Sequence, residues 1–480
     1  MSVFPHTTPW SRILGLLSFF VPLAPHAANL QVQDLFFVGS HRFPVEVVGD
    51  DRNAFLRTEG GVLVYDYRRR AFTDNLMPGQ PLQGITYSTG KSRLYMKTQA
   101  GDAFEYNPVF RRATSVREQD VQGGGEGASV NLTGLSLGSD YFFLGDAVRD
   151  KWNRRADLVG ARQFEYDNLW VLTRGFGAFL GSARRKEAQP LWFGLYDAAA
   201  QSLFTDGKNI WFGGLRADGG LTSSRTDLTD WKVYPAQQEY DFPNGSIRAI
   251  LPWKGFLWMA TGLGVVRLEP EHKQFRHFRK LGTNDLTVFS LLVHEDKLFA
   301  GTEQGVARLD NPDGQFVDLG NPGGIAVPVF DLSEKGKDLW AATKYGLFVH
   351  YKGEWKTLND VSGEDVPEAL GQEIKSVAYH DSSLYWVSDN RIMTKSRKAL
   401  PRVLLERDRP FRIRFDGQYL LVGWYGGFTA WNMERGLWTD FTLADGIPGT
   451  QVLSFAKAGD FLWVGTDQGV MRIALRGYLP

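Results

Sequence analysis

The residue types that most often catalyse reactions or bind metals are sparse in this chain. Cysteine is absent, which excludes disulfides, thiolate metal sites and thiol nucleophiles. No two histidines have the spacing of a zinc-binding HExxH helix. Beyond residue 28 the histidines are His41, His272, His277, His294, His350 and His380. The sequence therefore predicts no metal site, no cofactor and no catalytic residue.

Two short motifs resemble ligand-binding loops but lack the residues that binding needs. Gly262-Leu-Gly264 lies between two short apolar runs, and no helix follows whose N-terminus could hold a phosphate. Asp310–Gln315 (DNPDGQ) lacks the alternating oxygen ligands and the final glutamate of a calcium loop. Both motifs indicate turns. No Gly-x-Ser-x-Gly motif is present.

The turns belong to a repeat that organises most of the chain. A short apolar strand ends in Thr, a turn of two or three residues follows, and a second apolar strand begins. The starts at Leu257, Leu298 and Leu339 are evenly spaced, at about 41 residues. The clearest copies are 257–268 (LWMATGLGVVRL), 298–309 (LFAGTEQGVARL), 339–350 (LWAATKYGLFVH) and 462–473 (LWVGTDQGVMRI); weaker copies start at Ala54, Leu94, Leu169, Ile210, Leu384 and Leu420, and a degenerate one covers 141–145.

Each unit contains four short strands separated by turn residues. In one unit they are 288–294, 297–301, 305–309 and 315–319. Four antiparallel strands in about 40 residues are typical of a propeller blade. No amphipathic helical segment separates the units, which disfavours a parallel sheet. The sequence therefore predicts an all-β propeller of four-stranded antiparallel blades.

The core LWxGTxxG(V/L), followed by an aromatic residue about 12 positions on, resembles the two-component regulator propeller repeat. The likeness covers about residues 54–474 and is best in the four copies quoted above. The resemblance implies bladed sensor domains of bacterial periplasmic proteins, which are often fused to histidine kinases. This chain carries no kinase, receiver or transmembrane segment of the hybrid sensors, so the resemblance supports fold and compartment more than signalling.

Two arrangements of the repeats are open. Seven starts from Ile210 to Leu462 predict a seven-bladed propeller over 190–480, with an N-terminal propeller-like half over 29–189. The alternative is one large ring of about ten blades. The last unit stops after its third strand, so a strand at 35–38 (LFFV) could supply the missing edge, which favours a single ring. The stretch 116–161 is the least regular, and is either a boundary or a loop.

The repeated residues have structural roles. The Leu-Trp pair suits the space between adjacent twisted blades. The strand-ending threonine suits a strand and can also bond a turn amide. The glycines that follow, Gly60, Gly264, Gly305, Gly346 and Gly469, allow a positive φ in a tight hairpin.

Positions where the turns depart from small polar residues are the predicted binding residues. Trp424 replaces the usual Thr and Tyr425 follows it, a pair that suits stacking on a sugar or packing on a partner protein. Trp424 can instead fill an enlarged gap between blades, and Arg174 can be an ordinary solvated or paired arginine. The predicted ligand-binding residues are Arg174, Phe176, Arg216, Lys344, Tyr345, Trp424 and Tyr425.

Residues 1–28 have the features of an export signal. Arg12 precedes an apolar run of about 12 residues, too short to span a bilayer comfortably, and cleavage is expected near Ala28. The 54 basic and 54 acidic residues leave no net charge, which disfavours nucleic acid and anionic membranes. We expect a periplasmic or secreted protein without stable membrane insertion.

These observations favour a non-enzymatic binding or scaffold protein of the bacterial cell envelope, whose partner is a protein or a glycan. Sequence alone does not show which carboxylates approach one another, so a polysaccharide lyase or hydrolase on a propeller is an alternative. The sensing module of a two-component system with a separate kinase is another. The oligomeric state is not predicted.

Overall fold

The structure, a computed structural model, describes residues 26–27, 35–40, 42–77, 80–117, 120, 125–151, 153–237, 241–281, 287–363, 366, 369–396 and 399–475. Its sheets consist of antiparallel strands, apart from the parallel pairing of β1 (His26–Ala27), inside the predicted export signal, with β41 (Leu437–Thr442). The described helices are one α-helix, α1 (Leu358–Ser362), and the 3-10 turns η3 (Glu165–Asp167), η5 (Pro322–Gly324) and η7 (Leu443–Asp445). The predicted all-β propeller of four-stranded antiparallel blades is confirmed.

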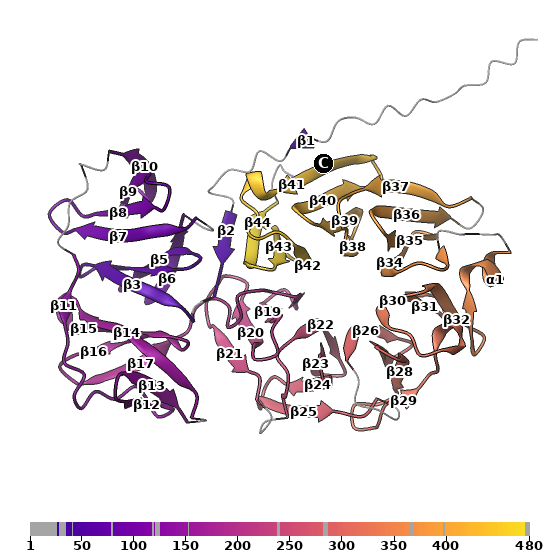
Figure 1. Cartoon of the computed structure of the whole chain (residues 1–480), viewed down its shortest axis with the longest axis horizontal. Coiled ribbons are helices and arrows are strands. Elements are labelled where there is room, and N and C mark those ends of the chain that lie inside the picture. The colour runs from indigo at the N-terminus through magenta and orange to yellow at the C-terminus, as the bar shows by residue number, and fades with distance from the viewer. Residues whose placement is uncertain are drawn as a thin grey trace, which may run out of the picture.

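Seven sheets, blades 1 to 7, form a ring (Figure 1). Blade 1 is β18 (Ser202–Thr205), β19 (Asn209–Gly213), β20 (Gly220–Arg225) and β21 (Lys232–Pro235); blade 2 is β22 (Ile247–Trp253), β23 (Phe256–Thr261), β24 (Gly264–Glu269) and β25 (Gln274–Phe278); blade 3 is β26 (Val288–His294), β27 (Lys297–Thr302), β28 (Gly305–Leu309) and β29 (Val317–Asp318); blade 4 is β30 (Val329–Lys335), β31 (Asp338–Thr343), β32 (Gly346–Tyr351) and β33 (Glu354–Thr357). Blade 5 is β34 (Ile374–His380), β35 (Ser383–Ser388), β36 (Arg391–Ser396) and β37 (Arg402–Glu406); blade 6 is β38 (Arg412–Asp416), β39 (Tyr419–Trp424), β40 (Gly427–Asn432) and β41; blade 7 is β42 (Val452–Ala458), β43 (Phe461–Thr466), β44 (Gly469–Ala474) and β2 (Leu35–Val38).

The ring closes after seven blades. The first strand of each blade lies innermost and contacts the first strand of the next, and β18 of blade 1 lies against β42 of blade 7. The alternative of one ring of about ten blades is therefore wrong.

The outer strand of blade 7 comes from the N-terminal region. β2 pairs with β44, with Leu35 opposite Ile473 and Val38 opposite Val470. The strand at 35–38 supplies the missing edge, as expected. It closes a ring of seven blades, because the chain after β2 leaves the ring and returns to it only at β18. The division at residue 189 assigned this strand to the N-terminal half, and the structure corrects that assignment.

Three further sheets lie beside the ring, at the left of Figure 1. The first is β3 (Pro44–Gly49), β4 (Asn53–Thr58), β5 (Gly61–Asp66) and β6 (Ala71–Leu76); the second is β7 (Leu82–Ser88), β8 (Arg93–Thr98), β9 (Ala103–Asn107) and β10 (Arg112–Val116); the third is β11 (Ala128–Ser129), β12 (Tyr141–Leu144), β13 (Ala147–Asp150), β14 (Arg155–Gln163), β15 (Asn168–Arg174), β16 (Gly177–Ser182) and β17 (Glu187–Leu191). The irregular stretch 116–161 thus holds strands of the third sheet, in addition to loops. Its longest strand, β14, carries a bulge between Leu158 and Gly160 that breaks the alternation a sequence pattern relies on.

A chain of aromatic contacts joins these sheets to the ring. Tyr65 of the first sheet contacts Phe72, with ring centroids 5.2 Å apart, and Phe72 contacts Phe193 at 4.4 Å. Phe193 then contacts Trp231 of the ring at 5.2 Å. These side chains belong to one hydrophobic cluster that includes buried residues from both parts. Aromatic burial of this kind favours a fixed contact between the two parts.

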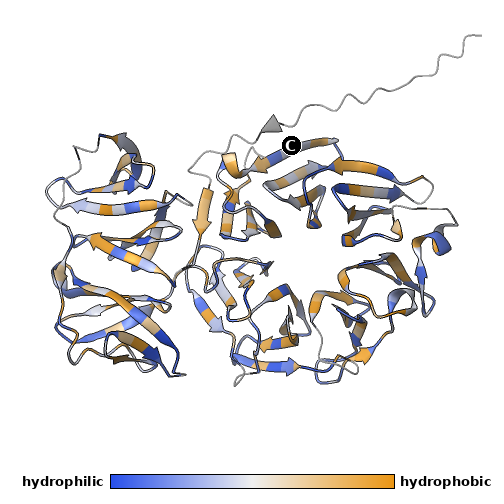
Figure 2. Ribbon diagram, in the orientation of Figure 1, coloured by the Kyte–Doolittle hydropathy of each residue, from blue (hydrophilic) through white to orange (hydrophobic). Residues whose placement is uncertain are grey.

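The repeated residues pack as their types require. Figure 2 shows hydrophobic residues along the strands of every sheet, and most buried clusters join neighbouring sheets, as when Trp258 of blade 2 packs with Leu298 and Leu309 of blade 3. Trp258, Trp386 and Trp463 are fully buried. The predicted role of the Leu-Trp pair between blades is confirmed.

The strand-ending threonines bond the turns. Thr302 Oγ1 accepts the N–H of Gln304 at 3.1 Å and donates to the carbonyl of Gly305 at 3.0 Å. The same pair of bonds recurs at Thr58, Thr173, Thr261, Thr343 and Thr466. One glycine was misassigned: the positive φ, 125°, is at Gly61 and not at Gly60, where a Cβ would lie 2.7 Å from Cε1 of Phe37.

Candidate functional site

One side of the ring carries all the turns that link second to third strands. Because neighbouring strands are antiparallel, those turns open on the same side as the links from one blade to the next. The turns that link first to second and third to fourth strands open on the opposite side. Each blade therefore contributes one turn and one link to the same side of the ring.

Large hydrophobic residues are exposed on that side. We call them the apolar turn face: Leu215, Leu263, Ile325, Tyr345 and Leu443, with exposed fractions of 39%, 48%, 59%, 45% and 50%. They come from turns or links of blades 1, 2, 3, 4 and 6. Because five blades place an apolar side chain on the same side of the ring, a partner bound there would contact several of them at once.

Five predicted residues lie in turns on this side. Arg216 stands in the β19–β20 turn, where its guanidinium donates to Asp218 through Nε at 2.9 Å and Nη2 at 3.0 Å. Lys344 and Tyr345 form the β31–β32 turn, and Lys344 Nζ lies 5.8 Å from the Tyr345 ring centre. The structure thus places Arg216, Lys344 and Tyr345 at the surface that the sequence indicated.

Trp424, another of the five, is only half-buried but is held by its neighbours. Its Nε1 donates to Thr429 Oγ1 at 3.1 Å, and Thr429 Oγ1 donates to Asp440 at 2.6 Å. The guanidinium of Arg407 lies 5.8 Å from the indole centre. Trp424 also packs on the cluster between blades 5 and 6. This arrangement supports the structural interpretation, in which Trp424 fills a gap between blades.

Tyr425, the last of the five, is covered on one side of its ring. The guanidinium of Arg409 lies 3.7 Å from the ring centre, and Arg409 also pairs with Asp408 at 3.3 Å. The bond to Asp408 raises the pKa of Arg409. Tyr425 therefore offers an arginine-stacked ring at the surface.

Arg174 and Phe176 lie outside the ring, in the turn between β15 and β16 of the third N-terminal sheet. Phe176 is 7% exposed and packs on Tyr141, with ring centroids 5.3 Å apart. It is a core residue and presents no surface to a ligand, which corrects its selection from the sequence. Arg174 is exposed at the end of β15, apart from the other predicted residues.

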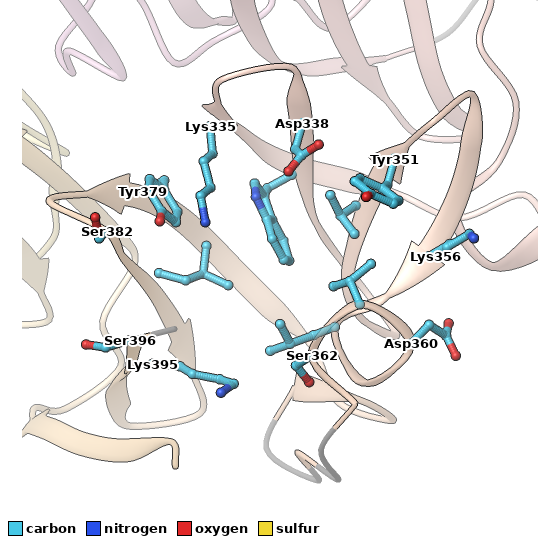
Figure 3. A pocket seen from close by; sticks show the side chains of 15 residues that line it. Lys335, Asp338, Tyr351, Lys356, Asp360, Ser362, Tyr379, Ser382, Lys395 and Ser396 are labelled. Atoms are coloured by element: carbon cyan, nitrogen blue, oxygen red, sulfur yellow. The ribbon is translucent and has the colours of Figure 1, made fainter. Parts of the chain in front are cut away.

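A pocket that the sequence did not indicate lies between blades 4 and 5 (Figure 3). Its volume is about 420 Å³. Lys335 Nζ lies 4.6 Å from the ring centre of Tyr379, and Lys395 Nζ donates to the carbonyl of Ala399 at 3.0 Å. Trp340 Nε1 and Tyr379 Oη are buried without a hydrogen-bond partner in the part of the chain that the structure describes. These lysines stand in separate repeats with no shared motif, so no sequence pattern pointed to them.

One carboxylate of this pocket, Asp360, caps a helix. Asp360 accepts hydrogen bonds from the N–H and hydroxyl of Thr357, at 2.8 and 2.7 Å, and completes the capping box of α1. The bond from Thr357 lowers the pKa of Asp360. Across the described ranges, no group of three or more His, Asp or Glu residues has the geometry of a metal site.

No family model and no curated protein matches this chain. Solved structures are similar in fold. PorZ, described as an essential bacterial surface component of the type-IX secretion system of Porphyromonas gingivalis, is 12% identical with a TM-score of 0.50, over 90% of this chain and 74% of PorZ. The extracellular domain of BT3049, described as a hybrid two component system of B. thetaiotaomicron, is 15% identical with a TM-score of 0.47, over 89% of this chain and only 61% of that domain. At these identities the likeness shows the fold alone, which is the propeller that the resemblance to the two-component regulator repeat implied.

Proposed function

We propose that this chain is an exported, non-enzymatic β-propeller that binds a partner in the bacterial cell envelope through the apolar turn face. The observation that carries the proposal is the exposure of apolar side chains at turns and links on one side of the ring. Three of the five are Leu and one is Ile. Aliphatic side chains suit a protein partner better than a glycan, which needs flat aromatic rings and polar groups.

The comparisons support export. PorZ, which shares the fold, is described as a bacterial surface component. The predicted export signal lies outside the described residues, apart from His26 and Ala27. In the part of the chain that the structure describes, no helix is long and apolar enough to cross a membrane.

Capture from an envelope extract tests the proposal. Purified wild type and the double variant Leu263→Asp/Tyr345→Asp are crosslinked to the extract, and bound proteins are compared by quantitative mass spectrometry. A partner recovered by wild type is expected to fall at least about tenfold with the variant, because charge in an apolar interface costs more than about 1.4 kcal/mol.

The matched control is Leu400→Asp. Leu400 is 72% exposed in the turn between β36 and β37, on the opposite side of the ring, so this variant is expected to recover the partner as wild type does. Equal recovery by all three proteins contradicts the proposal. Turnover of any substrate in a glycan panel contradicts its non-enzymatic part and favours the lyase or hydrolase alternative.

A further inference from the structure

The axis of the ring holds a cavity of about 410 Å³. The innermost strands of all seven blades line it, from β18 to β42 (Figure 1). Its volume falls in the range of pockets that take small molecules, about 300–1,000 Å³. The cavity is thus large enough for an organic ligand.

The charged residues that line the cavity are mostly arginines. They are Arg248, Arg412 and Arg414, and the one carboxylate that lines the cavity with them is Asp331. The chain as a whole has equal numbers of basic and acidic residues. The positive charge of the cavity is therefore a local feature of the ring axis.

Asp331 balances only one of the three arginines. Its carboxylate accepts hydrogen bonds from the hydroxyl of Ser376 and, at 3.1 Å, from the N–H of Val377. Its ion pair is with Arg412, at 3.4 Å. Arg248 and Arg414 have no ion pair within 4 Å among the described residues.

One nitrogen of the half-buried Arg248 side chain lacks a hydrogen bond. Its Nη1 is buried, and no acceptor in the described ranges bonds it. The guanidinium lies 5.2 Å from the ring centre of Phe289. Burial lowers the pKa of Arg248, and Glu303 opposes that shift only through its charge at longer range. A half-buried cation without an ion pair is costly, so its presence in a cavity is a sign of a ligand of opposite charge.

Arg414 stands on β38, across the ring from β22, which carries Arg248. Its Nη1 donates to the carbonyl of Phe455 at 3.0 Å, and the side chain is exposed to solvent inside the cavity. Desolvation by the surrounding blades lowers its pKa, the charge of Asp416 opposes that shift, and the charge of Arg412 adds to it. The remaining N–H groups of Arg414 are free to take up a ligand oxygen.

We propose that this axial cavity binds a small organic molecule bearing an oxyanion, a carboxylate or a phosphate, between Arg248 and Arg414. Guanidinium groups bind both anions through paired N–H donors, and such charge-assisted hydrogen bonds are stronger than neutral ones. The proposal goes beyond partner binding by the apolar turn face and does not depend on it.

Calorimetric titration of the purified chain with citrate and with inorganic phosphate tests the site. We expect at least one of them to bind, and Arg248→Gln and Arg414→Gln each to weaken that binding at least about tenfold. Citrate binding alone assigns a carboxylate ligand, and phosphate binding alone a phosphoryl ligand. Arg435→Gln, which changes an exposed arginine in the β40–β41 turn, is the control and should bind as wild type does. Binding of neither probe, or equal binding by all variants, overturns the proposal.

Thermal unfolding without added anion separates a binding role from a structural one. If Arg248 serves a ligand, Arg248→Gln leaves the melting temperature unchanged or raises it, since a half-buried charge without an ion pair is removed. A lower melting temperature for Arg248→Gln, together with unchanged anion binding in Arg414→Gln, would show that these arginines are structural.

Discussion

Arg407 and Asp440 form a two-pronged ion pair across the junction of blades 5 and 6. Arg407 Nη2 lies 2.7 and 2.9 Å from the two carboxylate oxygens of Asp440, and Arg407 Nε donates to Thr429 Oγ1 at 3.0 Å. Both side chains are 17% exposed. The pair therefore bonds the link after β37 to the third and fourth strands of the next blade. The indole ring of Trp424 packs against the guanidinium of Arg407.

Removing one partner of this pair should destabilise the ring. We expect Asp440→Ala to lower the free energy of unfolding by about 2–3 kcal/mol, because Arg407 and Thr429 lose their acceptor in a partly buried place. Urea unfolding followed by circular dichroism measures the change. The comparison is Asp218→Ala, which breaks the exposed pair with Arg216 and should cost less than about 1 kcal/mol. Equal losses in the two variants would show that the buried network adds nothing.

The threonine that ends a second strand should stabilise its hairpin through its hydroxyl. Thr302→Val keeps the shape but leaves the N–H of Gln304 without its acceptor, so a loss of about 1–2 kcal/mol in unfolding free energy is expected. Thr302→Ser keeps the hydroxyl and should recover most of the stability. If valine and serine have the same effect, the shape of the side chain matters and the hydrogen bonds do not.

The strand that closes the ring should be anchored by Phe37. This side chain is 3% exposed and packs in the core of blades 6 and 7. Phe37→Ala is expected to cost about 3–5 kcal/mol of unfolding free energy, with Phe37→Leu costing less. Phe110, which is 76% exposed, provides the control: Phe110→Ala should change stability by no more than about 0.5 kcal/mol. A Phe37→Ala protein as stable as the control would mean that β2 does not hold the ring shut.

His350 should make the protein less stable in mild acid. Burial, aided by the charge of Arg308, lowers the pKa of His350 below its ordinary value of 6.5. Below that value the unfolded chain binds the proton more readily than the folded chain, so the free energy of unfolding falls as pH falls. Above it the neutral ring stays packed beside Trp355, 5.2 Å away between centroids.

The variant His350→Gln cannot take up this proton. Its stability should therefore decline less than that of wild type between about pH 7.5 and about pH 5.5, as read from urea unfolding midpoints at each pH. Parallel declines in the two proteins would count against a role for His350.

The strands and turns of each blade could be predicted from the sequence because each repeat carries the residues that determine them. The Leu-Trp pair, the threonine and the turn glycine lie within about ten residues of one another, so strands and hairpins follow from short-range pattern. Ring size could not be read in the same way. Pairing of β2 with β44 joins distant segments, and the same closing strand fits a ring of seven blades or of ten.

The candidate sites were harder to predict for a similar reason. Phe176 has the sequence context of an exposed turn residue, and only its contact with Tyr141 shows that it is buried. Arg248 and Arg414 stand on first strands of different repeats, at positions where most other blades carry hydrophobic residues. Nothing in their spacing indicates that they line one cavity, because that depends on how the blades close around the axis.

The pairing of β2 with β44 also bears on how the protein assembles. The two strands are far apart in the sequence, and β2 is synthesised long before β44. The edges of β2 and β44 therefore stay unpaired until β44 has been made. The three sheets between β2 and β18 contain mostly local pairings and can form in the meantime. During export the open strands of blade 7 are a site for pairing with other chains, and a chaperone or rapid completion of synthesis would protect them.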